Sequence, residues 1–214
     1  MSEAGLAPFK ILVVCTGNIC RSPVAERLIQ AQSNALSLPV LVYSAGTQSM
    51  VGHDMTPEAA HLAERYGADP AGHVSQQLTE LLITDADLVL TATREHRSKV
   101  VSLHPRAARY TYTLNQFARL LPTAVESLLD PANAPIPSVE LVETPQPDLA
   151  TQLRALVTEV AATRGFSPPP PHPDDDDIED PYRQSTAVYA RAGTVINATV
   201  TQVTQSFAAA TRTR

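Results

Sequence analysis

The chain has 214 residues, of which 43% are hydrophobic, and carries a formal net charge of −6. This length suits one domain with additions and leaves enough apolar residues for a sizeable core. The acidic balance argues against a nucleic-acid partner, which would need a basic face. No apolar run approaches the ~20 residues of a membrane helix, so we expect no membrane association.

The cysteines and the N-terminus indicate the compartment. Two cysteines are too few for the disulfide framework of a secreted scaffold. The first residues lack the basic start and the apolar stretch of a signal peptide. We therefore expect a cytoplasmic protein with reduced thiols.

Apolar runs alternate with helical patterns through the first part of the chain. The expected strands are residues 9–14, 39–44, 86–91 and 110–114. The expected helices are residues 23–32, 57–66, 93–104 and 115–121, and a short helix is expected within residues 75–83. Strands that alternate with helices predict an α/β fold, a three-layer, doubly wound, four-stranded parallel sheet with helices on both faces. Gly46 and Gly52 are expected to form turns in the loop at 45–54.

Prolines set the second half of the chain apart. From residue 122 to 147 we expect an irregular insertion, with room for a helical turn at 124–129. A helix is expected at 148–164 and a long amphipathic helix at 185–208. We interpret the acidic run at 174–177 as a solvated tether.

These elements predict a single domain at residues 9–208. Irregular insertions are expected at 122–147 and 165–177, and flexible termini at 1–8 and 209–214. A monomer is the favoured oligomeric state.

Residues 15–23 read Cys-Thr-Gly-Asn-Ile-Cys-Arg-Ser-Pro and join the first strand to the first helix. A loop whose backbone N–H groups lead into a helix N-terminus is suited to bind a tetrahedral oxyanion, and Gly17 allows the chain to turn. The guanidinium of Arg21 can grip two phosphate oxygens at once. The same N–H groups favour the thiolate of Cys15, and Ser22 can donate a hydrogen bond to this sulfur. We therefore expect a sulfur nucleophile beneath a phosphate site, and we name residues 15–22 the phosphate loop.

Other interpretations of this loop explain fewer of its residues. A lone cysteine is often only a small buried hydrophobic residue. Two cysteines cannot close a structural zinc site, and no nearby histidine pair has ligand spacing. The Gly-x4-Gly-Lys-Ser/Thr motif of nucleotide-binding loops is absent. The joint pattern Cys-x5-Arg-Ser between a strand and a helix favours phosphate chemistry, for which we expect no metal and no cofactor.

Phosphate ester cleavage also needs an acid, because the leaving oxygen departs poorly without a proton. Asp180 is the candidate. Pro181 follows it and restricts its backbone to extended geometry, which suits a stiff loop over the site. The alternative is that Asp180 has no catalytic role and only forms a turn, since Asp-Pro is a common turn pair.

Residues 14–23 resemble the signature of the low-molecular-weight protein-tyrosine phosphatases. The similarity continues through Ser-Ala-Gly-Thr at 44–47, Ala-Asp-Leu-Val-Leu at 86–90 and Asp-Pro-Tyr at 180–182. It covers residues 9–121 and 178–207. The resemblance implies a hydrolase that releases inorganic phosphate from a phosphorylated protein or a small phosphomonoester.

The resemblance also implies a role for each matching residue. Cys15 is the nucleophile that forms a cysteinyl-phosphate, Arg21 binds the phosphate, and Asp180 serves first as acid and then as base. The residues of the phosphate-binding loop are Thr16, Gly17, Asn18, Ile19, Cys20, Arg21 and Ser22. Asn18 and Ser22 fix the loop, with Ser44 and His73 as supporting residues. Cys20 is the partner of Cys15 in a reversible disulfide.

The substrate cleft departs from the family pattern. Met50 stands where many relatives place a large aromatic residue, and Tyr182 is followed by Arg183 instead of a second aromatic residue. Relatives that act on phosphoarginine tend to carry threonine at the position of Ile19. Ile19 therefore favours phosphotyrosine, while the altered cleft leaves the substrate open.

Three alternative functions remain. The first is a protein-arginine phosphatase. The second is an arsenate reductase that uses an external thiol, because no cysteine beyond Cys20 is present for a thiol relay. The third is a module that binds phosphoproteins without turnover, although mere binding would not need Cys15, Arg21 and Asp180 together.

Overall fold

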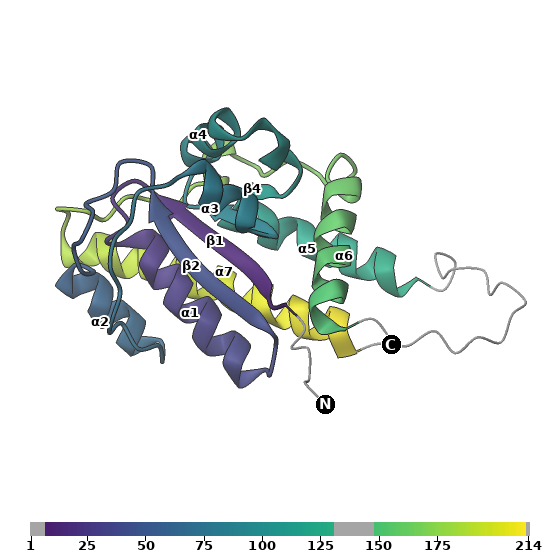
Figure 1. Cartoon of the computed structure of the whole chain (residues 1–214), viewed down its shortest axis with the longest axis horizontal. Coiled ribbons are helices and arrows are strands. Elements are labelled where there is room, and N and C mark those ends of the chain that lie inside the picture. The colour runs from purple at the N-terminus through teal and green to yellow at the C-terminus, as the bar shows by residue number, and fades with distance from the viewer. Residues whose placement is uncertain (1–6, 131–147, 213–214) are drawn as a thin grey trace, which may run out of the picture.

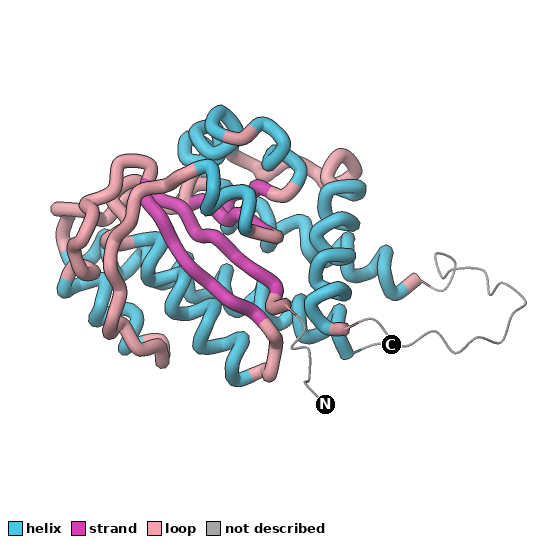
Figure 2. The backbone as a smooth tube through the Cα atoms, viewed as in Figure 1, coloured by secondary structure: helices cyan, strands magenta, loops and turns pink. Residues whose placement is uncertain are grey.

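The computed structural model describes residues 7–130 and 148–212. Its four strands form one parallel sheet in the order β2-β1-β3-β4 (Figures 1 and 2). The strands are β1 (Phe9–Cys15), β2 (Val40–Gly46), β3 (Leu88–Thr91) and β4 (Thr111–Thr113). The expected α/β architecture is confirmed, and the strands lie within the predicted segments to one or two residues.

Helices cover both faces of the sheet, so the molecule has three layers (Figure 1). The helices are α1 (Arg21–Ala35), α2 (Pro57–Arg65), α3 (Glu80–Asp85), α4 (Arg94–Leu103), α5 (Leu114–Leu129), α6 (Leu149–Thr163) and α7 (Thr186–Arg212). Two 3₁₀ turns, η1 (Pro105–Arg109) and η3 (Pro173–Asp176), complete the described elements. Among the described residues, no helix combines the length and the apolar character that a membrane span requires.

Strand β1 shows how the sequence builds these layers. Successive side chains of a strand point to opposite faces. Phe9, Ile11 and Val13 therefore enter the large core beneath α1, α5 and α7, whereas Leu12 and Val14 enter a smaller core beneath α3 and α4. Burial on both faces explains the unbroken apolar run that precedes the phosphate loop.

The expected end of the fifth helix at residue 121 is wrong, because α5 continues through Pro122 to Leu129. A proline inside a helix removes one N–H donor, here the one that would bond the carbonyl of Ala118. The side chain of Gln202 on α7 donates to that carbonyl instead, at 2.8 Å. Burial of Ala124 on the continued apolar face adds a further reason for the helix to persist.

Two further expectations need correction. The short helix expected within 75–83 is α3, but it begins only after its capping residue Thr79 and runs to Asp85, while residues 75–79 are not helical and Gln77 forms a bridge with Gly46. Helix α7 extends to Arg212, past the expected fraying point at residue 208.

The acidic run is not a solvated tether. Asp176 is only 6% exposed and pairs with Arg119 at 3.1 Å. Asp174 and Asp177 both bind the guanidinium of Arg94. These ion pairs fasten the segment before Asp180 to α4 and α5. Residues 131–147 of the insertion expected at 122–147 lie outside the described residues, as do residues 1–6 and 213–214 of the flexible ends expected at 1–8 and 209–214.

Candidate active site

The phosphate loop lies at the carboxyl end of β1, the strand between β2 and β3. Figure 2 shows that several loops gather at this end of the sheet, where ligands of open α/β sheets usually bind. Cys15 is the last residue of β1 and Arg21 is the first residue of α1. Both side chains are almost fully buried.

Five consecutive carbonyls of the loop accept hydrogen bonds from residues outside it. These bonds run to Cys15 O from Thr47 N, to Thr16 O from Gln48 N, to Gly17 O from Met50 N and Ser75 Oγ, to Asn18 O from His73 Nε2, and to Ile19 O from Thr56 N. In a trans peptide the C=O and the following N–H point in opposite directions. The N–H groups of residues 16–20 therefore turn away from these partners, toward the centre of the loop. Within the described residues these N–H groups donate no hydrogen bond, so they could all donate to a bound oxyanion.

Asn18 sets the shape of the loop. Its backbone has φ of 57°, a left-handed conformation that asparagine tolerates better than most residues. Its fully buried side chain donates to Ser22 Oγ at 3.0 Å and to Ser44 Oγ at 2.7 Å, and accepts from the N–H of Gln76 at 2.9 Å. The predicted supporting residue Ser44 thus reaches the loop through Asn18.

Behind Asn18 lies a partly buried carboxylate that the sequence reasoning missed. Glu26 on α1 accepts a hydrogen bond from Ser44 and lies 3.8 Å from His73 Nδ1. His73 in turn donates from Nε2 to the carbonyl of Asn18 at 2.7 Å. Glu26 therefore holds Ser44 by a hydrogen bond and lies beside His73. Glu26 is the only acidic residue of α1, and this was the available signal.

His96 on α4 was also missed. Its Nε2 is 2.8 Å from Thr16 Oγ1 and its Nδ1 is 2.7 Å from Thr93 Oγ1, so both ring nitrogens are engaged. Burial, and secondarily the charge of Arg21, lowers the pKa of His96 to about 4. The imidazole is therefore neutral at pH 7 and holds the side chain of the loop's second residue.

A cavity of about 170 Å³ opens above the loop. Its lining residues are Cys15, Thr16, Gly17, Ile19, Cys20, Arg21, Gln48, Met50, Asp180 and Tyr182. The structure thus brings together the predicted nucleophile, the predicted phosphate-binding arginine and the predicted acid. Asn18, Ser22, Ser44 and His73 lie behind the lining as its supports.

Arg21 joins the acid segment to the loop. Its Nη2 lies 2.8 Å from the carboxylate of Asp180, which is half exposed, and its Nη1 donates to the carbonyl of Ile178 at 3.1 Å. The buried Nε of Arg21 has no partner among the described residues. A buried donor left unpaired is costly, so a phosphate oxygen that accepted from this Nε would be favoured.

The two cysteines have different surroundings. Cys15 Sγ lies 3.0 Å from Ser22 Oγ, the hydroxyl expected to donate to it. Cys20 Sγ lies near the hydroxyls of Tyr189 and Thr56, and its burial raises the pKa of its thiol. Both thiols are free.

The walls of the cavity differ from the predicted cleft at one position. Met50 and Tyr182 line it, as expected, but Arg183 does not. Arg183 has φ of 60°, and its guanidinium stacks over the ring of Tyr182, 5.1 Å from the ring centre. In the described ranges, no three His, Cys, Asp or Glu side chains come together as ligands for a metal ion.

Comparisons with known proteins agree with this geometry. The family model for low molecular weight phosphotyrosine protein phosphatases matches residues 10–165, a range that stops short of Asp180. The low molecular weight protein-tyrosine-phosphatase Etp of Escherichia coli is 39% identical over 108 residues, which cover 50% of this chain and 70% of that one. The protein-arginine-phosphatase of Bacillus subtilis is 34% identical over 155 residues, 72% of this chain and 98% of that one.

Solved structures extend the match beyond the family model. Vibrio vulnificus Wzb in complex with benzylphosphonate has a TM-score of 0.61 at 25% identity, over 92% of this chain and 97% of that one. The YwlE arginine phosphatase from Geobacillus stearothermophilus has a TM-score of 0.61 at 26% identity, over 92% of both chains. The chain therefore belongs to the low molecular weight phosphotyrosine protein phosphatase family, a family of hydrolases.

Proposed function

We propose that the protein hydrolyses phosphomonoesters through a cysteinyl-phosphate, and that its substrate is a phosphorylated protein with phosphotyrosine preferred. The observation that carries this proposal is the convergence of Cys15, Arg21 and Asp180 on one cavity, with Asp180 only 2.8 Å from Arg21. These residues supply a nucleophile, a cation for the phosphate and an acid. Localisation in the cytoplasm and a monomeric state belong to the same proposal.

The first step transfers the phosphoryl group to sulfur. The thiolate of Cys15 attacks phosphorus, the bond to the leaving oxygen breaks, and Asp180 gives its proton to that oxygen. Arg21 and the inward N–H groups of the loop stabilise the charge on the equatorial oxygens. An entering phosphate dianion takes the place of Asp180 at Arg21, which frees the carboxyl group of Asp180 to face the leaving oxygen.

The second step releases inorganic phosphate. Asp180 takes a proton from a water molecule, whose oxygen attacks phosphorus as the P–S bond breaks. Ser22 Oγ, 3.0 Å from the sulfur, can donate to the departing thiolate. This hydrogen bond stabilises the leaving sulfur and returns Cys15 to its starting state.

The residues that line the cavity favour a substrate whose phosphate is attached to an aromatic ring. Ile19 and Met50 present apolar surface, and Tyr182 presents a ring, so the entrance can pack against a phenyl group. The guanidinium of phosphoarginine would lose solvation against Ile19 and Met50. Protein-arginine phosphatase stays the second candidate, because the relative of that name is matched over 98% of its length.

The mechanism is tested by hydrolysis of aryl phosphates in the presence of a chelator. Cys15→Ser should abolish turnover. Asp180→Asn should reduce kcat by about 10²–10⁴ for phenyl phosphate and by less for p-nitrophenyl phosphate, whose leaving group needs little help from an acid. Asp69→Asn, which changes an exposed acid in the turn after α2, is the matched control and should keep full activity.

Other outcomes would redirect the proposal. Unchanged turnover in Cys15→Ser would exclude the cysteinyl-phosphate. Faster release from a phosphoarginine peptide than from a phosphotyrosine peptide would favour the second candidate. Arsenate-dependent consumption of an added thiol would indicate a reductase, and tight phosphopeptide binding without phosphate release would indicate a binding module.

A further inference from the structure

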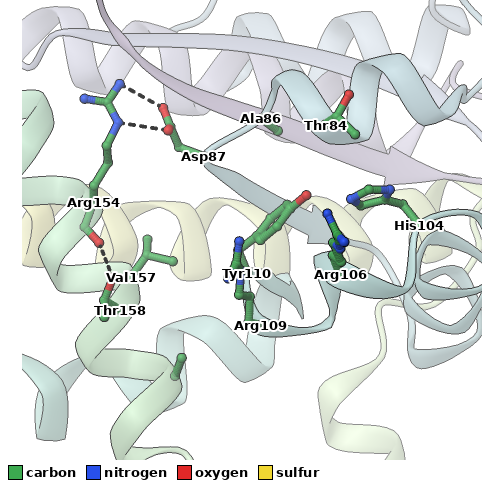
Figure 3. A pocket seen from close by; sticks show the side chains of 11 residues that line it. Thr84, Ala86, Asp87, His104, Arg106, Arg109, Tyr110, Arg154, Val157 and Thr158 are labelled. Carbon is green, nitrogen blue, oxygen red and sulfur yellow. Dashed lines mark hydrogen bonds and ion pairs between the residues drawn. The ribbon is translucent and has the colours of Figure 1, made fainter.

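A second cavity, of about 650 Å³, lies between η1 and helix α6 (Figure 3). Thr84, Ala86 and Asp87 from the chain before β3 form one side of it. His104, Arg106, Arg109 and Tyr110 from the turn before β4 form another, and α6 closes it with Arg154, Val157, Thr158 and Ala161. A volume in the range of about 300–1,000 Å³ is typical of small-molecule sites.

This cavity is remote from the phosphate loop. Asp87 directly precedes β3 and Tyr110 directly precedes β4, so the cavity lies at the amino ends of the strands. The phosphate loop follows the carboxyl end of β1. A strand of seven residues, such as β1, spans roughly 23 Å. A ligand of the second cavity would therefore not overlap with the substrate.

The lining concentrates positive charge in an acidic protein. Arg106, Arg109 and Arg154 face a single lining carboxylate, Asp87, although the whole chain carries a formal charge of −6. Asp87 binds the fork of Arg154 at 2.9 and 3.2 Å, so that arginine is held in place. The guanidinium groups of Arg106 and Arg109 make no hydrogen bond or ion pair with any residue that the structure describes. Two guanidinium groups without such partners, beside one cavity, could donate paired hydrogen bonds to phosphate oxygens.

The remaining lining supplies a flat apolar surface. Figure 3 shows the ring of Tyr110 between the side chains of Arg109 and Arg106, and Val157 projects from α6. The hydroxyl of Tyr110 donates to the carbonyl of Ile83 at 3.3 Å, which fixes the ring. A planar ring can stack on such a face. We propose that this cavity binds a small organic phosphate of the nucleotide class, with its phosphates at Arg106 and Arg109 and its base against Tyr110.

Calorimetric titration of metal-free ADP into the full chain tests the proposal. ADP is not a phosphomonoester, so it is not a substrate of the proposed reaction. The double variant Arg106→Ala/Arg109→Ala, which changes two exposed side chains, should bind ADP at least 30-fold more weakly. Arg65→Ala, an exposed arginine on α2, is the matched control and should bind as the unaltered chain does.

A further variant separates the two cavities. Arg21→Ala should retain ADP binding, because Arg21 lies at the phosphate loop. Loss of binding in Arg21→Ala with retention in the double variant would place ADP at the loop and overturn the proposal. Absence of binding at millimolar ADP would also overturn it. Pyrophosphate that binds as tightly as ADP would contradict recognition of the base.

Discussion

His96 should make the stability of the protein depend on pH. Burial, together with Arg21, lowers the pKa of this imidazole from 6.5 to about 4. In the unfolded chain the imidazole of His96 is protonated below about pH 6.5, whereas in the folded chain it is protonated only below about pH 4. The stabilisation is fully present above pH 6.5 and is lost as the pH falls toward 4. At pH 5, the difference in protonation of His96 between the two states lowers the free energy of unfolding by about 2 kcal/mol.

Urea unfolding at pH 7 and pH 5, followed by circular dichroism, measures this loss. The variant His96→Gln keeps a side chain that can bond Thr16 but cannot titrate, so its loss between the two pH values should be about 2 kcal/mol smaller than that of the unaltered chain. His61→Gln removes an exposed histidine on α2 and should leave the pH dependence unchanged. An equal loss in the unaltered chain and in His96→Gln would refute a buried, neutral His96.

Four further substitutions test the supports of the fold and of the loop. Asn18→Ala removes three buried hydrogen bonds worth about 1 kcal/mol each and should lower both the free energy of unfolding, by about 3 kcal/mol, and kcat/KM. Gly46→Ala would press its Cβ against the carbonyl oxygen of Thr16 in the phosphate loop, so kcat/KM should fall by about tenfold or more. Gly52→Ala, at φ of 83° in open space, should cost only about 1–2 kcal/mol of stability and leave turnover intact, and equal activities in the two variants would contradict the close approach. Gln202→Ala leaves the carbonyl of Ala118 unbonded and should destabilise the chain by about 1–3 kcal/mol in thermal unfolding, whereas an unchanged midpoint would show that Pro122 needs no such partner.

The local features of the fold could be predicted from the sequence because their causes are local. An apolar run buried on both faces specifies β1 whatever follows it. Thr56 caps α2 and Thr93 caps α4. Each threonine side chain accepts a hydrogen bond from the backbone N–H three residues later. The loop motif between a strand and a helix is likewise continuous in sequence.

The remaining features depend on residues far apart in the chain. Thr16 and His96 are 80 positions apart, and Ala118 and Gln202 are 84 apart. Taken alone, Pro122 predicts the end of a helix, and the acidic run at 174–177 predicts a segment exposed to solvent. Only the tertiary structure shows that Gln202 replaces the missing donor and that arginines of α4 and α5 neutralise the acids.

Arg21 links the proposed phosphate site to the proposed acid, Asp180, through the shape of its guanidinium as well as through its charge. The N–H of Ile178 donates to the carbonyl of Ala92, just after β3, and the carbonyl of Ile178 accepts from Arg21. The acid segment is therefore anchored to the sheet on one side and to the arginine on the other. Arg21 uses one nitrogen for this carbonyl and a second for Asp180, and its buried Nε remains for phosphate. A lysine ammonium at the same place would offer a single charged point and could not hold the segment and the phosphate oxygens in separate directions. The planar guanidinium thus gives a reason for arginine in the proposed phosphate site. It also holds Asp180, 159 residues later in the chain, at the cavity that Cys15 lines.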